Sequence, residues 1–288
     1  MVADVKGPSR DGSLGSLWFR RPPAVPITGM APTDPPLRDS TPQAPATRLS
    51  PEEPQLLAEE ALALDAWLER EQGFSLAALM GQAGARVADT ARELIATRGL
   101  ARVVVLVGPG NNGGDGLVAV QRLATGAGGA AALPATLWQP LPRSPQADVL
   151  AAAACGPLHP VPVLVVTHEA PALDRDTLLI DALFGVGLAR PLDGAARRAV
   201  EHVRARRPVV LSVDLPSGLD GSTGEVVGGA GGLAMRADVT LTFILPKAGL
   251  IRGAGPALSG EVRVADLGVA REPVLAWLAE RRRASASA

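Results

Sequence analysis

Residues 103–116 read VVVLVGPGNNGGDG, an apolar run followed at once by a glycine-rich turn. The residues after it, 117–125, follow the spacing of an amphipathic helix, so this stretch predicts a strand, a tight turn and a helix in that order. Glycines let the backbone turn sharply and approach a ligand, while the free N–H groups at a helix start attract phosphate. The stretch therefore predicts an α/β unit whose turn binds an anion or a nucleotide.

The turn only partly fits the known nucleotide-binding motifs. Gly108-x-Gly110-x-x-Gly113 matches the dinucleotide fingerprint, which also requires an acid about 20 residues later for the ribose. No acid lies between Asp115 and Asp148, no Gly-Lys-Ser/Thr ending follows the turn, and the chain has no tyrosine. Ordinary hydride transfer and nucleotide hydrolysis are therefore disfavoured. Turn formation and helix capping remain the alternative for Asn111, Asn112 and Asp115.

Aliphatic and β-branched runs alternate with helical stretches from residue 100 onward. The runs that predict strands are 102–107, 135–138, 163–167, 177–180, 209–213, 239–243 and 261–265. Helical spacing predicts helices at 116–125, 146–154, 194–204 and 274–282, after two earlier ones at 50–70 and 75–96. Ser50 before Pro51 is typical of an N-cap with a first-turn proline. The alternation implies right-handed crossovers, so the predicted fold class is α/β, a Rossmann-like three-layer α/β/α sandwich with a mostly parallel sheet.

The composition allows one ordinary core and indicates no large charged partner. The 288 residues are 47% hydrophobic, with 28 Lys and Arg against 29 Asp and Glu, so we expect no nucleic acid and no membrane surface as partner. The apolar runs fall far short of the ~20 residues that span a bilayer, and residues 1–30 lack the apolar stretch of a signal peptide. A single cysteine excludes an internal disulfide. We therefore expect a cytoplasmic protein.

Proline content sets the expected boundaries of the folded domain. Residues 1–50 hold nine of the 26 prolines and few large aliphatic side chains. We therefore expect a disordered Pro-rich leader over 1–50, with Met30 as an alternative start. One domain is expected over 51–275, followed by a small polar C-terminal tail over 276–288.

Two further strands end in an aspartate followed by a glycine-containing loop. Asp181 follows the run 177–180, and Asp214 follows the run 209–213. Ligands of open α/β sheets bind at the carboxyl ends of the strands, so these acids and the 108–116 turn predict one composite site, although each aspartate alone could cap a turn. Carboxylate, asparagine and backbone carbonyl oxygens also suit an alkali or alkaline-earth cation. Pairing of a buried aspartate with backbone N–H groups or with arginine is the alternative.

The other reactive side chains carry weaker signals. Lys247 follows the run 239–243 and is expected either to neutralise a ligand phosphate at the same sheet edge or to be a solvated lysine. Cys155 is expected to be a small core residue. The histidines show no metal-ligand spacing and are expected at the surface (His159, His168 and His202).

Five blocks together resemble a known family, the NAD(P)H-hydrate epimerases, also called YjeF N-terminal domain proteins. These blocks are residues 58–84, 108–116, 181–187, 214–220 and 260–268, and the resemblance covers about residues 55–270 in order. It implies an α/β/α Rossmann-like fold, usually dimeric, that binds K+ and interconverts the R and S forms of hydrated NADH and NADPH (NADHX and NADPHX). Gly81 departs from the pattern, because the family commonly has an acid there. Many members continue into a dehydratase domain, so we expect a separate ADP/ATP-dependent NAD(P)HX dehydratase to act on the product.

The resemblance also implies roles for individual residues. Asp214 would contact the hydrated nicotinamide and act as the catalytic residue, and Asn112, Asp181 and Ser217 would correspond to the potassium ligands. The residues that would line the dinucleotide are Asn111, Asn112, Gly113, Gly114, Asp115, Gly185, Val186, Gly187, Leu188, Ala189, Arg190 and Pro191.

The chemistry that follows is a proton transfer without redox change. Asp214 would act as general acid and base at the C6 hydroxyl, so that water leaves one face of the ring and returns to the other while the ring nitrogen holds the transient cation. A ring-opening route is an alternative. Two rival functions are a non-catalytic nucleotide-binding scaffold of the same fold and a dinucleotide oxidoreductase, the latter disfavoured by the missing ribose acid.

Overall fold

A single eight-stranded sheet organises the chain. The computed structural model describes residues 46–50, 52–126, 131–155 and 165–286. The strand order is β1-β8-β7-β6-β5-β2-β3-β4, parallel throughout except for the edge pair β1–β8. The strands are β1 Thr47–Arg48, β2 Arg102–Val107, β3 Ala135–Trp138, β4 Val165–Thr167, β5 Thr177–Ala182, β6 Val209–Val213, β7 Val239–Phe243 and β8 Glu261–Ala265. The predicted mostly parallel sheet is confirmed.

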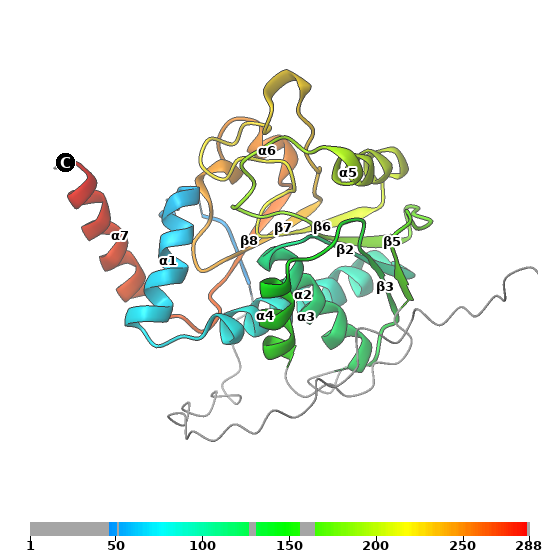
Figure 1. Ribbon diagram of the computed structural model, residues 1–288, viewed down its shortest axis with the longest axis horizontal. Coiled ribbons are helices and arrows are strands. Elements are labelled where there is room, and N and C mark those ends of the chain that lie inside the picture. Colours follow the sequence, from blue (N-terminus) through cyan, green and yellow to red (C-terminus); the bar gives the residue numbers. More distant parts are fainter. Residues whose placement is uncertain (1–45, 51, 127–130, 156–164, 287–288) are drawn as a thin grey trace, which may run out of the picture. The chain divides into compact units, whose positions relative to one another are not determined.

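Helices cover both faces of this sheet (Figure 1). They are α1 Ala58–Glu71, α2 Leu76–Arg98, α3 Asn111–Thr125, α4 Pro145–Cys155, α5 Gly194–Arg206, α6 Gly255–Leu258 and α7 Arg271–Ala286, with 3-10 turns η3 Gly229–Gly231 and η4 Ala248–Leu250. Val103, Val105 and Val107 of β2 belong to the core that includes α2 and α3. Val104 and Leu106 point the other way, into the core built with α5, as the two-residue period of a strand requires. The layers are those of the predicted α/β/α sandwich.

The start of the first helix differs from the prediction. Ser50 was expected to cap a helix, but α1 begins eight residues later, at Ala58. The chain before it is extended because its backbone groups have partners elsewhere: β1 pairs with β8, and the Leu49 N–H donates to the Val262 carbonyl. The strand β1 also lies within the segment expected to be a leader. Of that segment, residues 1–45 lie outside the described residues.

Helix α3 begins at Asn111, five residues before the predicted start. The sequence placed the glycines in a turn, whereas Gly113, Gly114 and Gly116 lie inside the helix and are buried. A Cβ added to Gly114 would stand 2.5 Å from the Met80 Cε atom, and one on Gly116 would stand 2.6 Å from the Ala182 Cβ atom. Since real Cβ contacts are never that short, these glycines let α3 pack directly on α2 and β5.

Several smaller predictions can also be compared with the structure. Cys155 ends α4 as a half-buried free thiol beside a small apolar cluster. His168 is exposed as expected, but His202 is half-buried, edge-on to the Trp138 ring with centroids 5.7 Å apart. His159 lies outside the described residues. Among the described residues, no helix combines the length and apolar character needed to cross a membrane.

Candidate functional site

The carboxyl ends of four parallel strands open into one cleft of about 440 Å³. The residues that follow β2, β5, β6 and β7 form one wall, and α1 and α2 contribute another. Its size lies within the range of about 300–1,000 Å³ typical of small-molecule sites. The composite site predicted from the three acid- and glycine-containing turns therefore exists, and a fourth strand end joins it.

Asp214 and Lys247 form a buried ion pair in this cleft. The Lys247 Nζ atom lies 2.6 Å from Asp214 Oδ1, and the same oxygen accepts a hydrogen bond of 3.0 Å from Thr242 Oγ1. Lys247 is only 5% exposed, so it is not the solvated lysine that the sequence left open. Asp214 has a φ of 66°, a left-handed conformation that is costly for a residue with a Cβ. Such strain is typical of functional sites, because the surrounding structure has to hold the residue there.

Asn112 reaches the same point from the first turn of α3. Its Oδ1 lies 3.2 Å from the position that a Cβ on Gly185 would occupy, and Asp214 Oδ2 lies 3.4 Å from that position. The absent side chain of Gly185 thus gives both polar groups room. The Asn112 Nδ2 atom is buried and has no hydrogen-bond partner in the described part of the chain. A buried amide without a partner is costly, so a small rotation of the Asn112 side chain that brought this N–H group to a ligand would be favourable.

Asp181 and Ser217 lie beneath the cleft and do not line it. Because β5 continues to Ala182, Asp181 is part of the strand and is fully buried, beside Ser212 of β6. Its Oδ1 accepts a hydrogen bond of 2.6 Å from Ser217 Oγ, and its Oδ2 accepts 2.9 Å from Ser212 Oγ and 3.0 Å from the Ser217 N–H. Burial raises the pKa of Asp181, and these hydrogen bonds oppose the rise. The alternative of pairing with backbone N–H groups therefore holds for this aspartate.

The expected dinucleotide-lining residues divide into two groups. Those that line the cleft are Asn111, Asn112, Asp115, Gly185, Val186, Gly187, Leu188 and Asp214. Gly113 and Gly114 are buried inside α3, and Ala189, Arg190 and Pro191 are exposed outside the lining. The turn after β5 therefore contributes its first half to the cleft.

Asp65 lines the cleft and was not singled out from the sequence. It comes from α1 and keeps an exposed surface. The atoms packed around its carboxyl desolvate it in part, which raises its pKa to about 6. The charge of Lys247 lowers this pKa, whereas that of Asp214 raises it. Asp65 occupies a position in the helical spacing of Ala61, Leu64 and Leu68, and an acid within an apolar stripe is the sequence signal that could have found it.

Asp115 is a second carboxyl with a displaced pKa. Burial raises its pKa well above the usual value, and the neighbouring charges of Asp214 and Asp65 raise it further, against the effect of Lys247 and Arg143. No described residue donates a hydrogen bond to it. Perturbed carboxyls gathered in a cleft are characteristic of catalytic and binding sites.

Arg143 holds the glycine-rich turn from behind and was also missed. Its side chain is fully buried, with Nη1 donating to the Gly108 carbonyl at 2.6 Å and Nε contacting Asp148 Oδ1 at 2.6 Å. The next residue contributes as well, since the Ser144 N–H donates to the Pro109 carbonyl at 3.0 Å. The loop between β3 and α4 thus fixes the turn that lines the cleft. The sequence offers no signal for it, because nothing local links residue 143 to residue 108.

Comparison with known proteins gives one consistent result. The family described as YjeF-related protein N-terminus matches residues 76–249. The NAD(P)H-hydrate epimerase of Lentilactobacillus buchneri is 32% identical over 216 residues, which cover 75% of this chain and 95% of that protein. The NAD(P)H-hydrate epimerase of Bordetella pertussis is 40% identical over 196 residues, covering 67% and 80%.

Two further matches concern a longer protein and a solved structure. The bifunctional NAD(P)H-hydrate repair enzyme Nnr of Thermofilum pendens is 38% identical over 205 residues, 70% of this chain, and the match spans 37% of that enzyme. The crystal structure of yeast ynu0 matches with a TM-score of 0.54 and 24% identity, covering 68% of this chain and 82% of the yeast chain. This structural likeness concerns the fold alone.

Proposed function

The chain belongs to the YjeF-related protein N-terminus family, and we propose that it is an NAD(P)H-hydrate epimerase, which interconverts the R and S forms of hydrated NADH and NADPH in nicotinamide nucleotide repair. The observation that carries the proposal is the cleft in which Asp214 and Lys247 form their ion pair beside the glycine-rich turn. Relatives named NAD(P)H-hydrate epimerase match this chain over 67–75% of its length. The acids and the asparagine of the site are all present, which speaks against a non-catalytic scaffold.

The start of α3 supports binding of the substrate's pyrophosphate. Gly110 occupies the N-cap position, and a Cβ on it would meet no atom within 4 Å, so the backbone is open to a ligand. The first N–H groups of a helix have no intrahelical partner and carry a partial positive charge. Pro109, Gly110 and Asn111 line the cleft at this point. A phosphate group bound here would place the rest of the substrate along the sheet edge.

Asp214 is the group proposed to exchange protons with the substrate. Lys247 and Thr242 hold one of its oxygens, Oδ1, which leaves Oδ2 free to face the cleft beside Gly185. A carboxyl fixed in this way acts as general acid and base at the C6 hydroxyl, and the negative charge of its ionised form stabilises a cationic ring as it develops. A small rotation of the Asn112 side chain would let its unpaired Nδ2 donate to a polar group of the bound substrate.

We also propose that K+ binds next to the cleft, held by Asn112, Asp181 and Ser217. The donor set fits: Ser217 Oγ lies 2.6 Å from Asp181 Oδ1 and 3.3 Å from the Phe184 carbonyl oxygen, and Asn112 approaches the adjoining Gly185. These are the hard oxygens that alkali cations prefer. The buried Asp181 forms no ion pair within the described residues, so a cation would supply its missing counter-charge. Bound K+ would offset the negative charge of the site.

The cation proposal is tested by stability. If K+ binds at this site, the melting temperature of the wild type should be higher in KCl than in tetramethylammonium chloride at equal ionic strength. Asp181→Asn retains a similar shape but removes the charge, so the melting temperature of this variant should be the same in the two salts. An equal response of both proteins to the two salts would refute the proposed site.

The proposed activity is tested with a coupled assay. Purified protein is added to R-NADHX together with an S-specific dehydratase, and full conversion to NADH is expected only if the chain epimerises the substrate. Asp214→Asn should lower the rate by roughly 100-fold or more, whereas Asp89→Asn, at an exposed position of α2 outside the cleft, should leave it unchanged. Conversion that stops when the S form is consumed would refute the proposal.

Three further features belong to this proposal. The product would pass to a separate ADP/ATP-dependent dehydratase. One relative of this chain, from Thermofilum pendens, is named a bifunctional NAD(P)H-hydrate repair enzyme, and the match spans 37% of it. We propose a homodimer, for which light scattering of the purified protein is the test. A single cysteine supports the cytoplasm as the compartment, and fractionation of cells with an antibody to the chain tests it.

A further inference from the structure

Helix α1 presents one acid to the cleft. Ala61, Leu64 and Leu68 are buried and fix the orientation of the helix. Leu62 and Asp65, three residues apart and so on adjoining positions of the helix surface, both line the cleft. Asp65 therefore reaches the site from a different wall than Asp214, which extends from the end of β6.

The base of α1 is attached to the segment that carries Lys247. The Leu56 N–H donates to the Pro246 carbonyl and the Ala248 N–H donates to the Leu56 carbonyl, both at 2.8 Å. These two bonds flank Lys247 on either side. Leu56 and Lys247 thus form an isolated parallel β-bridge. This bridge positions both the start of the helix that carries Asp65 and the lysine that pairs with Asp214.

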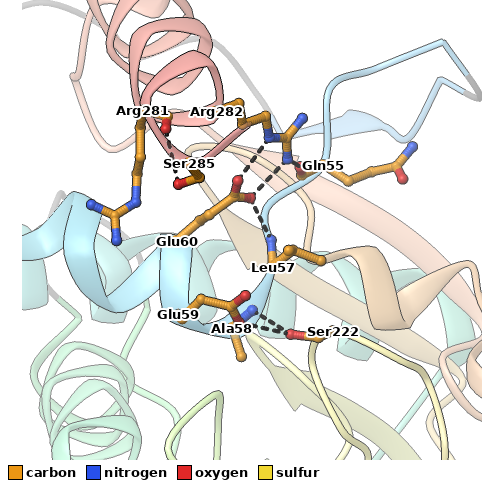
Figure 2. Close-up of polar contacts among 9 residues, drawn as sticks. All are labelled: Gln55, Leu57, Ala58, Glu59, Glu60, Ser222, Arg281, Arg282 and Ser285. Carbon is orange, nitrogen blue, oxygen red and sulfur yellow. Dashed lines mark hydrogen bonds and ion pairs between the residues drawn. The ribbon is translucent and has the colours of Figure 1, made fainter. Parts of the chain in front are cut away.

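Two more contacts fix the first turn of α1 (Figure 2). The Ala58 N–H donates to Ser222 Oγ at 2.8 Å, and the Leu57 N–H donates to Glu60 Oε2 at 2.8 Å. Arg282 of α7 reaches Glu60 with two nitrogens at 2.7 Å each, as Figure 2 shows. Since Asp65 lies less than two turns further along, its position relative to the cleft is well defined.

The Asp65 carboxyl makes no hydrogen bond or ion pair with any described residue. Asp115 and Asp214 line the same cleft, yet no group of three acidic, histidine or cysteine side chains among the described residues is arranged to hold a metal ion. The carboxyls therefore surround a space instead of converging on one point. A polar group with no partner that faces such a space is suited to contact a substrate.

From this arrangement we propose that Asp65 is a second catalytic acid–base residue, which acts on the C6 hydroxyl from the α1 wall while Asp214 acts from the sheet wall. The inference rests on the proposed epimerase function. Epimerisation requires a proton to be given on one face of the ring and removed on the other, and two carboxyls on different walls supply both functions without movement of the ring.

The proton and electron balance of the step is complete. In one direction the Asp65 carboxyl gives its proton to the leaving hydroxyl, the C6–O bond breaks, and water departs while the ring nitrogen lone pair forms a double bond to C6. Water then adds to the other face of C6, and the Asp214 carboxylate accepts its proton. The reverse direction exchanges the two roles, and proton exchange with solvent in the open cleft resets the pair. No oxidant or reductant takes part.

The charges around Asp65 suit it to this role. The charged neighbours that act on its pKa are Lys247, which favours the ionised form, and Asp214, whose negative charge favours the protonated form. Asp115 also faces the cleft, and its own pKa is raised by burial and by the charges of Asp214 and Asp65. Asp65 keeps an exposed surface, but desolvation of its carboxyl by the surrounding atoms is the largest influence and raises its pKa to about 6. A carboxyl that titrates near neutrality can both give and accept a proton at working pH.

The test compares Asp65→Asn, Asp65→Glu and the surface control Asp89→Asn in the coupled NADHX assay. We expect Asp65→Asn to lower kcat by roughly 100-fold with little change in KM, and Asp65→Glu to restore part of the loss. The wild-type kcat/KM should fall as pH rises above about 6, because the protonated acid is lost, and Asp65→Asn should lack this limb. Melting temperatures within a few degrees of wild type would show that the variants are folded.

The outcomes separate this inference from the proposed function. An inactive wild type would refute the epimerase function itself. An active wild type with an equally active Asp65→Asn variant, or with the same pH limb in that variant, would overturn the role of Asp65. A raised KM with unchanged kcat would also overturn it, since Asp65 would then only bind substrate.

Discussion

Substitution of Glu60 should destabilise the attachment of the first turn of α1. It is 5% exposed, accepts the Leu57 N–H and forms a two-nitrogen contact with Arg282 (Figure 2). Losing the first-turn hydrogen bond costs about 1 kcal/mol, and losing an ion pair with one buried and one half-exposed partner costs roughly 1–2 kcal/mol. Glu60→Ala should therefore destabilise the fold by about 2–3 kcal/mol, or roughly 4–12 °C in melting temperature for a domain of this size.

The pH dependence of this effect has a definite sign. Burial raises the pKa of Glu60, but the hydrogen bonds from Arg282 and Leu57 and the nearby positive charges outweigh it, so the pKa is lowered in the folded chain. A lowered pKa gives stability that is complete above the unfolded value, about 4.5, and is lost as pH falls through the folded value. The difference between wild type and Glu60→Gln should therefore be full at pH 7 and shrink in acid.

Thermal and urea unfolding of Glu60→Ala, Glu60→Gln and the exposed control Glu69→Gln measures these differences. Glu60→Gln retains an acceptor for the Leu57 N–H, so it should lose only the ionic part, about 1–2 kcal/mol. A double-mutant cycle with Arg282→Met isolates the pair itself. Melting temperatures of both Glu60 variants within 1 °C or so of wild type at pH 7, or a difference that persists unchanged in acid, would refute the reasoning.

Three other variants test the site and its support. Arg143→Lys removes the forked contact with the Gly108 carbonyl and Asp148. In steady-state kinetics we expect the increase in KM to be several-fold larger than the decrease in kcat. An unchanged KM would contradict the positioning role of Arg143. Gly108→Ala places a Cβ 1.6 Å from the Leu183 carbonyl oxygen, so it should cost more than ~3 kcal/mol, and a normal melting curve would exclude this packing. Burial raises the pKa of the Cys155 thiol to about 11, so it should react with a thiol reagent at pH 8 roughly 100-fold more slowly than a free cysteine peptide; equal rates would contradict its burial.

The strands of this fold could be predicted because their signals are local. The bounds of β2, β3, β6, β7 and β8 agree with the β-branched and aliphatic runs of the sequence. The end of β5 could not be found in this way, since an aspartate is unfavourable inside a strand. Its burial is compensated by Ser212 and Ser217, which are 31 and 36 residues away along the chain, and such partners are visible only after the sheet has formed.

Two helix starts, those of α1 and α3, were predicted wrongly for a related reason. Glycine has a low intrinsic helix propensity, so Gly113 and Gly114 indicated a turn. Because a glycine has no side chain, α2 can approach α3 closely at Gly114, and this packing stabilises the helix. Ser50 and Pro51 have the chemistry of a helix start, yet hydrogen bonds with β8 keep the neighbouring chain extended. In both places a tertiary contact outweighs the local preference.

The residues of the site also differ in whether the local sequence could predict them. Asn112 and Asp214 could be found because turns that follow parallel strands must meet at one sheet edge. Asp65 was missed although its place in the apolar stripe of α1 is a signal, because the helical period does not show whether that position faces the core or a cleft. An acid beside such a stripe is stable only if it reaches water or a partner. Asp65 meets this requirement because it is exposed and lines the cleft. Since Lys247 is paired with Asp214, the Asp65 carboxyl has no ion-pair partner among the described residues, and a bound substrate would become its partner.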